Sequence, residues 1–278
     1  MRAISLLFHD VYVDHPDESG FTSEAANRYK LALGDFDAQL AGVDGVRSDS
    51  PVLASAMAPV GRAWRARQGS PHTVNPFLVT VDDGGAAYHD WIAERLERRG
   101  WRGHCFVSTD CIGRRGFLRR EQIRELAERG HIIGSHSASH PVRFNALPFS
   151  EMVSEWSRSR AVLEDIVGRA VDVGSVPGGY FSPAVARAAR DAGLRTLFTS
   201  EPVTRVHEDG DLLLVGRFTI RRGDPHNRAR RLVSAPAWTR SLEWASWNAK
   251  GLVKPLLGPS YIRIADWLLA TRPSDRAS

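Results

Sequence analysis

Residues 77–85 read FLVTVDDGG, an apolar run that ends in two adjacent carboxylates and two glycines. A short apolar run rich in β-branched residues predicts a buried strand over Phe77–Val81, and the glycines predict a turn directly after it. Neighbouring carboxylates repel each other unless a cation or a proton lies between them. Asp82 and Asp83 are therefore a first candidate for a metal or acid–base site, with a solvated Asp-Gly turn as the alternative.

Strands and helices alternate regularly after this stretch. The expected strands are His104–Val107, His131–Gly134, Ala170–Val176, Arg195–Thr199 and Leu212–Ile220, and the expected helices are Ala87–Arg99, Leu118–Arg129, Phe149–Val167 and 182–193. Alternation of this kind implies parallel strands joined by helical crossovers. We therefore predict an α/β protein, built as a (β/α) barrel or as a doubly wound sheet.

Both ends of the chain depart from this alternation. The elements expected there are one strand, Ala3–Phe8, and three helices, Ser23–Leu40, Ser241–Leu257 and Tyr261–Ala270. We expect residues 1–221 to form the barrel. Residues 222–278 are expected to form a helical extension that packs on the barrel or serves a partner or a membrane surface.

Composition places the chain among soluble globular proteins. Of its 278 residues, 42% are hydrophobic and 25% are charged, which excludes a disordered tail protein or a collagen-like fibre. Two cysteines, Cys105 and Cys111, are too few for a disulfide framework or a cysteine-based zinc site.

Charge is unevenly spread along the chain. The net charge is +5, yet residues 213–278 alone carry twelve basic and four acidic side chains. This basic tail, which also carries tryptophans, would suit an anionic membrane surface, giving a peripheral membrane contact. It shows no nucleic-acid-binding motif, so we expect no nucleic-acid partner.

The first residues lack the features of an export signal. The apolar run Ala3–Phe8 is shorter than a signal-peptide core, and no small-residue cleavage site follows it. No stretch approaches the roughly 18 apolar residues of a membrane span. We therefore expect a cytoplasmic protein, with the membrane surface as a further location.

Two other strand ends carry unusual residues. Residues 134–141 read GSHSASHP, and residues 176–179 read VPGG. Two histidines four apart share one face if the segment turns helically, so His136 and His140 could meet one ion, although a surface pair is the simpler alternative for a bare HxxxH pattern. The glycines after Pro177 could offer backbone N–H groups to an oxyanion, or form an ordinary turn.

Strand ends gather on one edge of an α/β fold, so these motifs are expected to meet. Two histidines and one aspartate make a three-ligand metal site with open positions, the pattern of catalytic sites. The second aspartate could then serve as a general base.

These motifs resemble those of the NodB-type polysaccharide deacetylases, a carbohydrate esterase family. Residues 80–84 read TVDDG where the family has TFDDG, and residues 136–140 read HSASH where it has H[ST]xxH. The resemblance covers roughly residues 74–200 and implies an irregular (β/α) barrel of the NodB type. It also implies that Asp82 is the catalytic base and that Asp83, His136 and His140 bind a divalent metal ion, with Zn²⁺ as the usual metal.

The third motif of the family, R-x-P-[YF], is altered in this chain. Residues 175–178 read SVPG, so Ser175 stands where the family has the arginine that steadies the base. We expect Arg217 or Arg143 to substitute for it. The N–H of Gly178 matches the amide with which the family binds the oxyanion.

The family's last motif places a general-acid histidine in an apolar strand near the end of the chain. His207 and His226 lack an apolar run before them, but residues 6–10, LLFHD, fit the motif at the opposite end. Some members of the family are circularly permuted in this way. His9 is therefore the candidate acid, and a histidine at the end of an edge strand is the alternative.

Taken together, the resemblance implies a metal-dependent hydrolase that removes N-acetyl groups from an amino sugar in a polysaccharide, a glycan or a lipid-linked precursor. O-deacetylation or deformylation by the same groups is an alternative. A second alternative is a non-catalytic carbohydrate-binding protein that retains the fold. The departure at Ser175 favours it, and the retained Asp82, Asp83, His136 and His140 oppose it.

Overall fold

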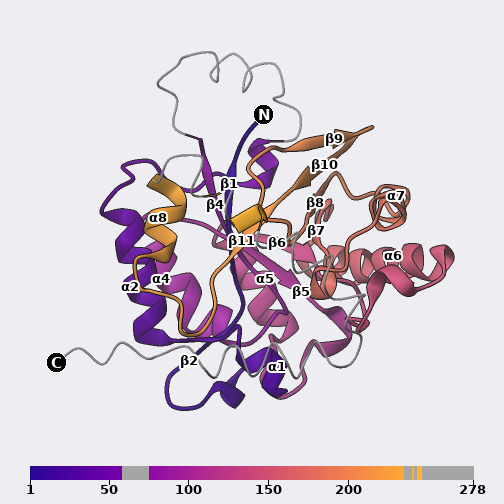
Figure 1. The fold of residues 1–278 in the computed structure, drawn as a ribbon. Coiled ribbons are helices and arrows are strands. Elements are labelled where there is room, and N and C mark those ends of the chain that lie inside the picture. Colours follow the sequence, from indigo (N-terminus) through magenta and orange to yellow (C-terminus); the bar gives the residue numbers. More distant parts are fainter. Residues whose placement is uncertain (58–74, 235–239, 241–242, 246–278) are drawn as a thin grey trace, which may run out of the picture.

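The computed structural model describes residues 1–57, 75–234, 240 and 243–245. Its centre is a nine-stranded sheet in the order β11-β1-β4-β5-β6-β7-β8-β10-β9 (Figure 1). The strands are β1 (Ile4–Phe8), β4 (Phe77–Val81), β5 (His104–Val107), β6 (Ile132–Ser135), β7 (Val173–Ser175), β8 (Thr196–Phe198), β9 (His207–Asp209), β10 (Leu212–Val215) and β11 (Arg217–Thr219). All pairings are parallel except that of β9 with β10, which confirms the predicted α/β class.

The sheet curves into an irregular (β/α) barrel. β10 pairs with β8 and β11 pairs with β1, although Gly216 alone separates β10 from β11. The single strand predicted over Leu212–Ile220 is therefore wrong, because the chain bends at Gly216. A Cβ at this position would collide with the carbonyl oxygen of Glu201, so glycine is required where the strand turns.

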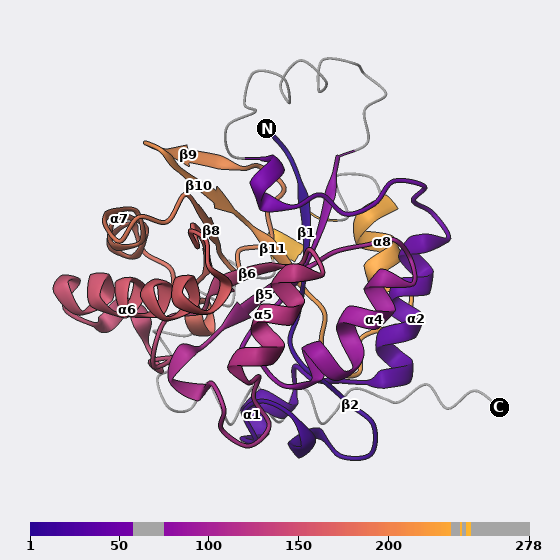
Figure 2. The ribbon, with the colours of Figure 1, turned by 180° about the vertical axis from the view of Figure 1, so that it is seen from behind.

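Helices cover the outside of the barrel. They are α2 (Leu33–Asp44), the π-helical turn η3 (Tyr88–Ile92) continued by α4 (Ala93–Glu97), α5 (Arg120–Glu128), α6 (Phe149–Val167), α7 (Pro183–Asp191) and α8 (Arg228–Ser234). α2, α4 and α8 lie together on one side, and α6 and α7 lie together on the other (Figure 1 and Figure 2). α7 begins as predicted, with the Ser182 hydroxyl accepting from the Val185 N–H and with Pro183 at its first position.

Strands β1 and β4 set the position of the functional residues. Every residue of both strands is buried, and their register places Phe8 opposite Val81. The next residues of each strand, His9 and Asp82, therefore leave the sheet at the same edge. The N-terminal strand thus lies inside the sheet, between β11 and the strand that precedes the two carboxylates.

The helix predicted over Ser23–Leu40 is wrong as a single element. The chain forms α1 (Glu24–Asn27), the short strand β3 (Leu31–Ala32) and only then α2. Lys30 is buried at the break, where its Nζ donates to the carbonyl oxygens of Pro16 and Ser19 at 2.5 and 2.6 Å. β3 pairs with β2 (Val11–Tyr12), so tertiary contacts outweigh the helical pattern here.

The extension predicted for residues 222–278 is described only in part. Its first helix, α8, was not predicted and packs against α2, where Gln39 donates to the Pro225 carbonyl and accepts from the Ala229 N–H. The predicted helices Ser241–Leu257 and Tyr261–Ala270 lie outside the described residues, apart from helical residues 243–245. None of the helices in the described part of the chain has the length and apolar character that crossing a membrane requires.

Candidate active site

The predicted site residues gather at the carboxyl ends of four strands. His9 follows β1, the pair Asp82 and Asp83 follows β4, His136 follows β6, and Ser175 ends β7. The strands are parallel and adjacent, or nearly so, in the sheet, so their ends meet at one edge of the barrel. Residues that lie more than 160 positions apart in the chain thereby form one cluster.

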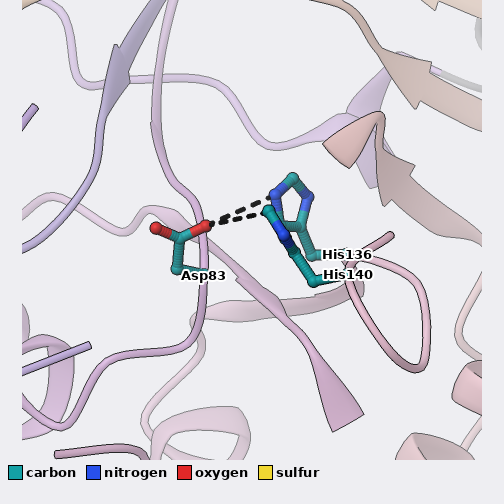
Figure 3. A group of neighbouring side chains, drawn as sticks. All are labelled: Asp83, His136 and His140. Atoms are coloured by element: carbon teal, nitrogen blue, oxygen red, sulfur yellow. Dashed lines mark ion pairs between the residues drawn. The ribbon is translucent and has the colours of Figure 1, made fainter. Parts of the chain in front are cut away.

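Asp83, His136 and His140 form the predicted three-residue metal cluster (Figure 3). The Asp83 Oδ1 lies 3.5 Å from the His136 Nε2 and 3.6 Å from the His140 Nε2, and the three ligand atoms lie within 4.8 Å of one another. These distances exceed those of normal hydrogen bonds. They suit three atoms that each approach a shared ion to about 2.0–2.2 Å.

The far side of the His136 ring supports a ligand role. Its Nδ1 lies 3.0 Å from the Ser175 carbonyl oxygen and 2.6 Å from the Ser175 Oγ, and the N–H donated there leaves Nε2 to face Asp83. A histidine that binds a metal commonly donates its other ring N–H to such a partner, which fixes the tautomer and the ring orientation. The residues present therefore fit a divalent metal ion.

The charges of the cluster are strongly coupled. Burial opposes ionisation of Asp83, but the neighbouring His136, His9 and His140 outweigh burial and hold the pKa of its carboxyl well below the usual value. Burial also disfavours a charged His136, yet Asp82 and Asp83 outweigh it and raise the pKa of that imidazole. Burial and the nearby His136 lower the pKa of His140. A bound cation would take the place of the protonated histidines as the positive partner of these carboxylates.

A strained turn carries the two histidines into place. Ser137 and His140 adopt left-handed backbone conformations, with φ of 63° and 53°. Glu155 on α6 accepts hydrogen bonds from the N–H groups of Ala138 and Ser139 at 3.0 and 2.8 Å, which holds the turn. Glu155 was missed from the sequence, since nothing in its local pattern distinguishes it from other acidic residues on a helix.

Asp82 is held separately from the metal cluster. Arg217 donates to both of its oxygens, Nη1 to Oδ1 at 2.7 Å and Nη2 to Oδ2 at 2.8 Å, and the Ser175 Oγ donates to Oδ1 at 3.1 Å. Burial disfavours the charged carboxylate, but Arg217 and His136 outweigh burial and lower the pKa of Asp82. Asp82 is therefore ionised and fixed in orientation.

Arg217 is itself completely buried on β11. Its Nε donates to the Thr199 carbonyl at 3.0 Å, and its guanidinium group lies 5.7 and 5.9 Å from the ring centres of Phe106 and Phe198. Of the two arginines expected to replace the one missing at position 175, Arg217 is thus the one that contacts Asp82. The expectation for Arg143 is wrong, because its guanidinium group lies over Tyr180 instead, at 5.9 Å.

His9 lies beside both carboxylates at the end of β1. Its ring contacts Tyr29 with ring centres 4.7 Å apart, and its buried Nδ1 has no hydrogen-bond partner in the described part of the chain. Burial lowers the pKa of His9, whereas the negative charges of Asp83 and Asp82 favour its protonated form. The structure therefore brings the candidate acid to the candidate base from the adjacent strand.

Gly178 lies in the turn Pro177–Gly179, directly after β7. Its φ of 60° is left-handed, and a Cβ there would lie 3.1 Å from the Tyr180 ring, which together favour glycine. The turn is on the same edge of the barrel as the metal cluster. Its role as an oxyanion-binding amide stays a prediction.

Comparisons with known proteins agree with this geometry. The family model described as Polysaccharide deacetylase matches residues 70–197. The Bacillus subtilis (strain 168) protein YxkH is 26% identical over 133 residues, which are 48% of this chain and 47% of that protein. The chain thus spans about half the length of this curated relative.

Solved structures share the fold across most of the chain. A polysaccharide deacetylase from Bacillus cereus superposes with a TM-score of 0.66, at 16% identity, over 84% of this chain and 69% of that one. A de-N-acetylase from Aggregatibacter actinomycetemcomitans gives a TM-score of 0.63, at 17% identity, over 79% and 95%. At these identities the likeness shows the fold alone.

The fold is that of solved polysaccharide deacetylases, and residues 70–197 match the polysaccharide deacetylase family in sequence. The aspartate–histidine–histidine cluster lies within that matched segment.

Proposed function

We propose that the protein is a metal-dependent hydrolase that removes N-acetyl groups from an amino sugar of a glycan. The observation that carries the proposal is the division of two adjacent aspartates into different environments. Asp83 faces two histidines, while Asp82 is bound by Arg217 and Ser175. We propose an N-linked acetyl group because a solved structure of similar fold is named as a de-N-acetylase.

Asp83, His136 and His140 would hold the metal ion, and zinc is the metal we propose, since imidazole nitrogens with one carboxylate are a common zinc ligand set. When bound, the ion would supply a Lewis acid for the acetyl carbonyl and lower the pKa of a water molecule.

Asp82 would act as the general base. Its Oδ2 lies 3.9 Å from the His136 Nε2, so the carboxylate borders the same space as the ligand atoms. Arg217 and Ser175 prevent the carboxylate from turning away, and they keep it ionised before it accepts a proton from the attacking water.

His9 would act as the general acid. The amine that leaves an amide needs a proton, and His9 lies on β1, next to the strand that carries Asp82. Burial lowers the pKa of His9 and so disfavours the protonated form, while the charges of the two aspartates oppose this effect. The Gly178 N–H would stabilise negative charge on the former carbonyl oxygen.

The alternatives differ in how well the geometry supports them. O-deacetylation or deformylation would use the same groups, so acetate and formate release from candidate sugars separates them from N-deacetylation. A non-catalytic sugar-binding protein was favoured mainly by the loss of arginine at position 175. Arg217 supplies that missing contact to Asp82, so the departure no longer speaks against catalysis.

The test is acetate release from a panel of N-acetylated sugars with added zinc. We expect His136→Ala and His140→Ala to lose both metal binding and turnover. His207→Ala is the matched control, because His207 is exposed on β9 and should leave both unchanged. Full turnover by either ligand variant, or by protein stripped of metal, would refute the proposal.

Three further statements stay predictions. They are the cytoplasmic location, the membrane contact through the basic tail, and the division into a barrel of residues 1–221 and an extension of residues 222–278.

A further inference from the structure

Two arginine–tyrosine pairs flank the candidate active site. On the side of the candidate acid, Arg221 follows β11, and its guanidinium group lies 5.2 Å from the ring centre of Tyr29. The same Tyr29 ring contacts His9. The Ile220 N–H donates to the Leu7 carbonyl, which fixes this segment beside the end of β1.

The second pair lies on the side of the metal ligands. Arg143 comes three residues after His140, and its guanidinium group lies 5.9 Å from the ring centre of Tyr180. Tyr180 in turn packs beside Gly178, the predicted oxyanion-binding residue. Each arginine is therefore connected through one tyrosine to a group of the proposed mechanism.

Neither arginine is neutralised by a carboxylate of the described residues. Both are exposed, and within the described ranges no carboxylate lies within 4 Å of either guanidinium group. The nearest acidic residue in sequence to Arg221, Asp224, accepts from the Arg221 backbone N–H and forms its ion pair with Arg228. By contrast, Arg95, which lies over Trp91, is paired with Asp37.

An arginine of this kind is suited to bind an anion. Contact with the tyrosine face holds the guanidinium group in place, while its N–H edge stays free to bind a carboxylate or phosphate through two parallel hydrogen bonds. One such group lies beside the end of β1 and the other follows the metal ligands, so the two could bind the sugars on either side of the reacting one.

We propose that the substrate is an anionic glycan, in which carboxylate or phosphate groups next to the N-acetylated sugar bind Arg221 and Arg143. This inference rests on the deacetylase function proposed above and names the substrate class of that site. Loss of a charge-assisted contact commonly reduces affinity about tenfold, so each arginine should contribute a selectivity of that order.

The test compares three probes on the zinc-loaded protein. They are a chitin oligosaccharide as the neutral probe, a hyaluronan oligosaccharide of equal length as the carboxylated probe, and N-acetylglucosamine 1-phosphate as the phosphorylated probe. We expect kcat/KM for at least one anionic probe to exceed that for the neutral one about tenfold. The anionic probe that is preferred identifies the charged group.

Charge-removing variants locate the contact. Arg221→Gln and Arg143→Gln should each lower kcat/KM for the preferred anionic probe about tenfold and leave the neutral probe nearly unchanged. Arg221→Lys should retain part of the preference, because it keeps the charge without the planar fork. Arg98→Gln is the control, since it removes the same charge from the exposed end of α4, next to the amino end of β5.

Binding to the metal-free protein separates this inference from the deacetylase proposal. If no probe releases acetate, calorimetric binding of the anionic probes still shows whether Arg221 and Arg143 select them. Equal binding and equal turnover of neutral and anionic probes by the wild type would overturn the inference. So would arginine variants that weaken all probes alike.

Discussion

The two aspartates of the first motif differ in their partners rather than in their burial. Asp83 is placed among histidines, and Asp82 is placed against Arg217 and Ser175. Both carboxylates have pKa values below the ordinary one, so each needs a positive partner at neutral pH. For Asp82 this partner is Arg217, which is always charged, whereas for Asp83 it is the neighbouring histidines.

Removing Arg217 should therefore destabilise the whole protein. Arg217→Met leaves Asp82 ionised, buried and without its charge partner, and breaking a buried pair in this way costs about 3–5 kcal/mol. Urea unfolding followed by circular dichroism measures the loss. The double variant Arg217→Met/Asp82→Asn should regain much of it, because the unpaired charge is gone. A single variant as stable as the wild type would contradict the assignment.

Removing the Ser175 hydroxyl should lower kcat more than it lowers the affinity for zinc. In Ser175→Ala the backbone carbonyl still accepts from the His136 Nδ1, but Asp82 loses one of its three donors. We expect kcat to fall about tenfold and zinc affinity, measured by chelator competition, to fall less than tenfold. Ser5→Ala is the control, a buried serine of β1 whose Oγ has no partner in the described residues. Unchanged turnover in Ser175→Ala would show that its hydroxyl does not hold the base.

At the scale of helices and strands, the local sequence pattern was sufficient to predict an element where a single rule decides its position. The helix over Phe149–Val167 follows from its apolar periodicity and ends at a left-handed Gly168, as such helices commonly do. The start of α7 follows from Ser182 and Pro183. Pattern failed over Ser23–Leu40, where Lys30 binds two carbonyl groups of a preceding loop that no local rule would connect to it.

The residues of the site also divide into those that a local sequence motif predicts and those whose contacts depend on the order of distant strands. Asp83, His136 and His140 could be found because each belongs to a recognisable motif at a strand end. The contact between Arg217 and Asp82 spans 135 positions, and choosing Arg217 over Arg143 required the pairing of β11 with β1. Long-range strand order of this kind is not encoded in any short segment.

The bend between β10 and β11 should tolerate no side chain. Gly216→Ala would force a Cβ against the Glu201 carbonyl and against Val203, so we expect a loss of about 1–3 kcal/mol in unfolding free energy. Gly34→Ala is the matched control, because a Cβ at this helical position meets nothing within 4 Å and should be neutral or stabilising by about 0.4–1 kcal/mol. Equal stability of both variants would show that the bend can relax.

For the molecule as a whole, buried neutral histidines should make stability depend on pH. His104 is completely buried, donates from Nδ1 to the Val79 carbonyl and accepts at Nε2 from the Ala54 N–H. Burial lowers its pKa from 6.5 to about 4. Between these values the unfolded chain binds a proton that the folded chain does not, so its contribution to stability is lost as the pH falls from 6.5 towards 4.

A variant isolates this single group from the others that titrate. The stability of the wild type relative to His104→Gln should fall by about 1.4 kcal/mol per pH unit within that window and stay constant above it. Urea unfolding at several pH values between 4 and 8 measures the difference. A difference that does not change with pH would mean that His104 is not held neutral.

The central claim is that Asp83, His136 and His140 hold a catalytic metal ion, while Asp82 serves only as the base. The most direct measurement is a zinc titration of the metal-free wild type and of the metal-free Asp82→Asn variant. Bound zinc and the acetate released from an N-acetylated sugar of the panel are recorded together. The wild type should bind one zinc ion per chain and release acetate in proportion to it. Asp82→Asn should bind zinc nearly as well and release acetate at least about a hundredfold more slowly. Acetate release without zinc, or full turnover by Asp82→Asn, would contradict the claim.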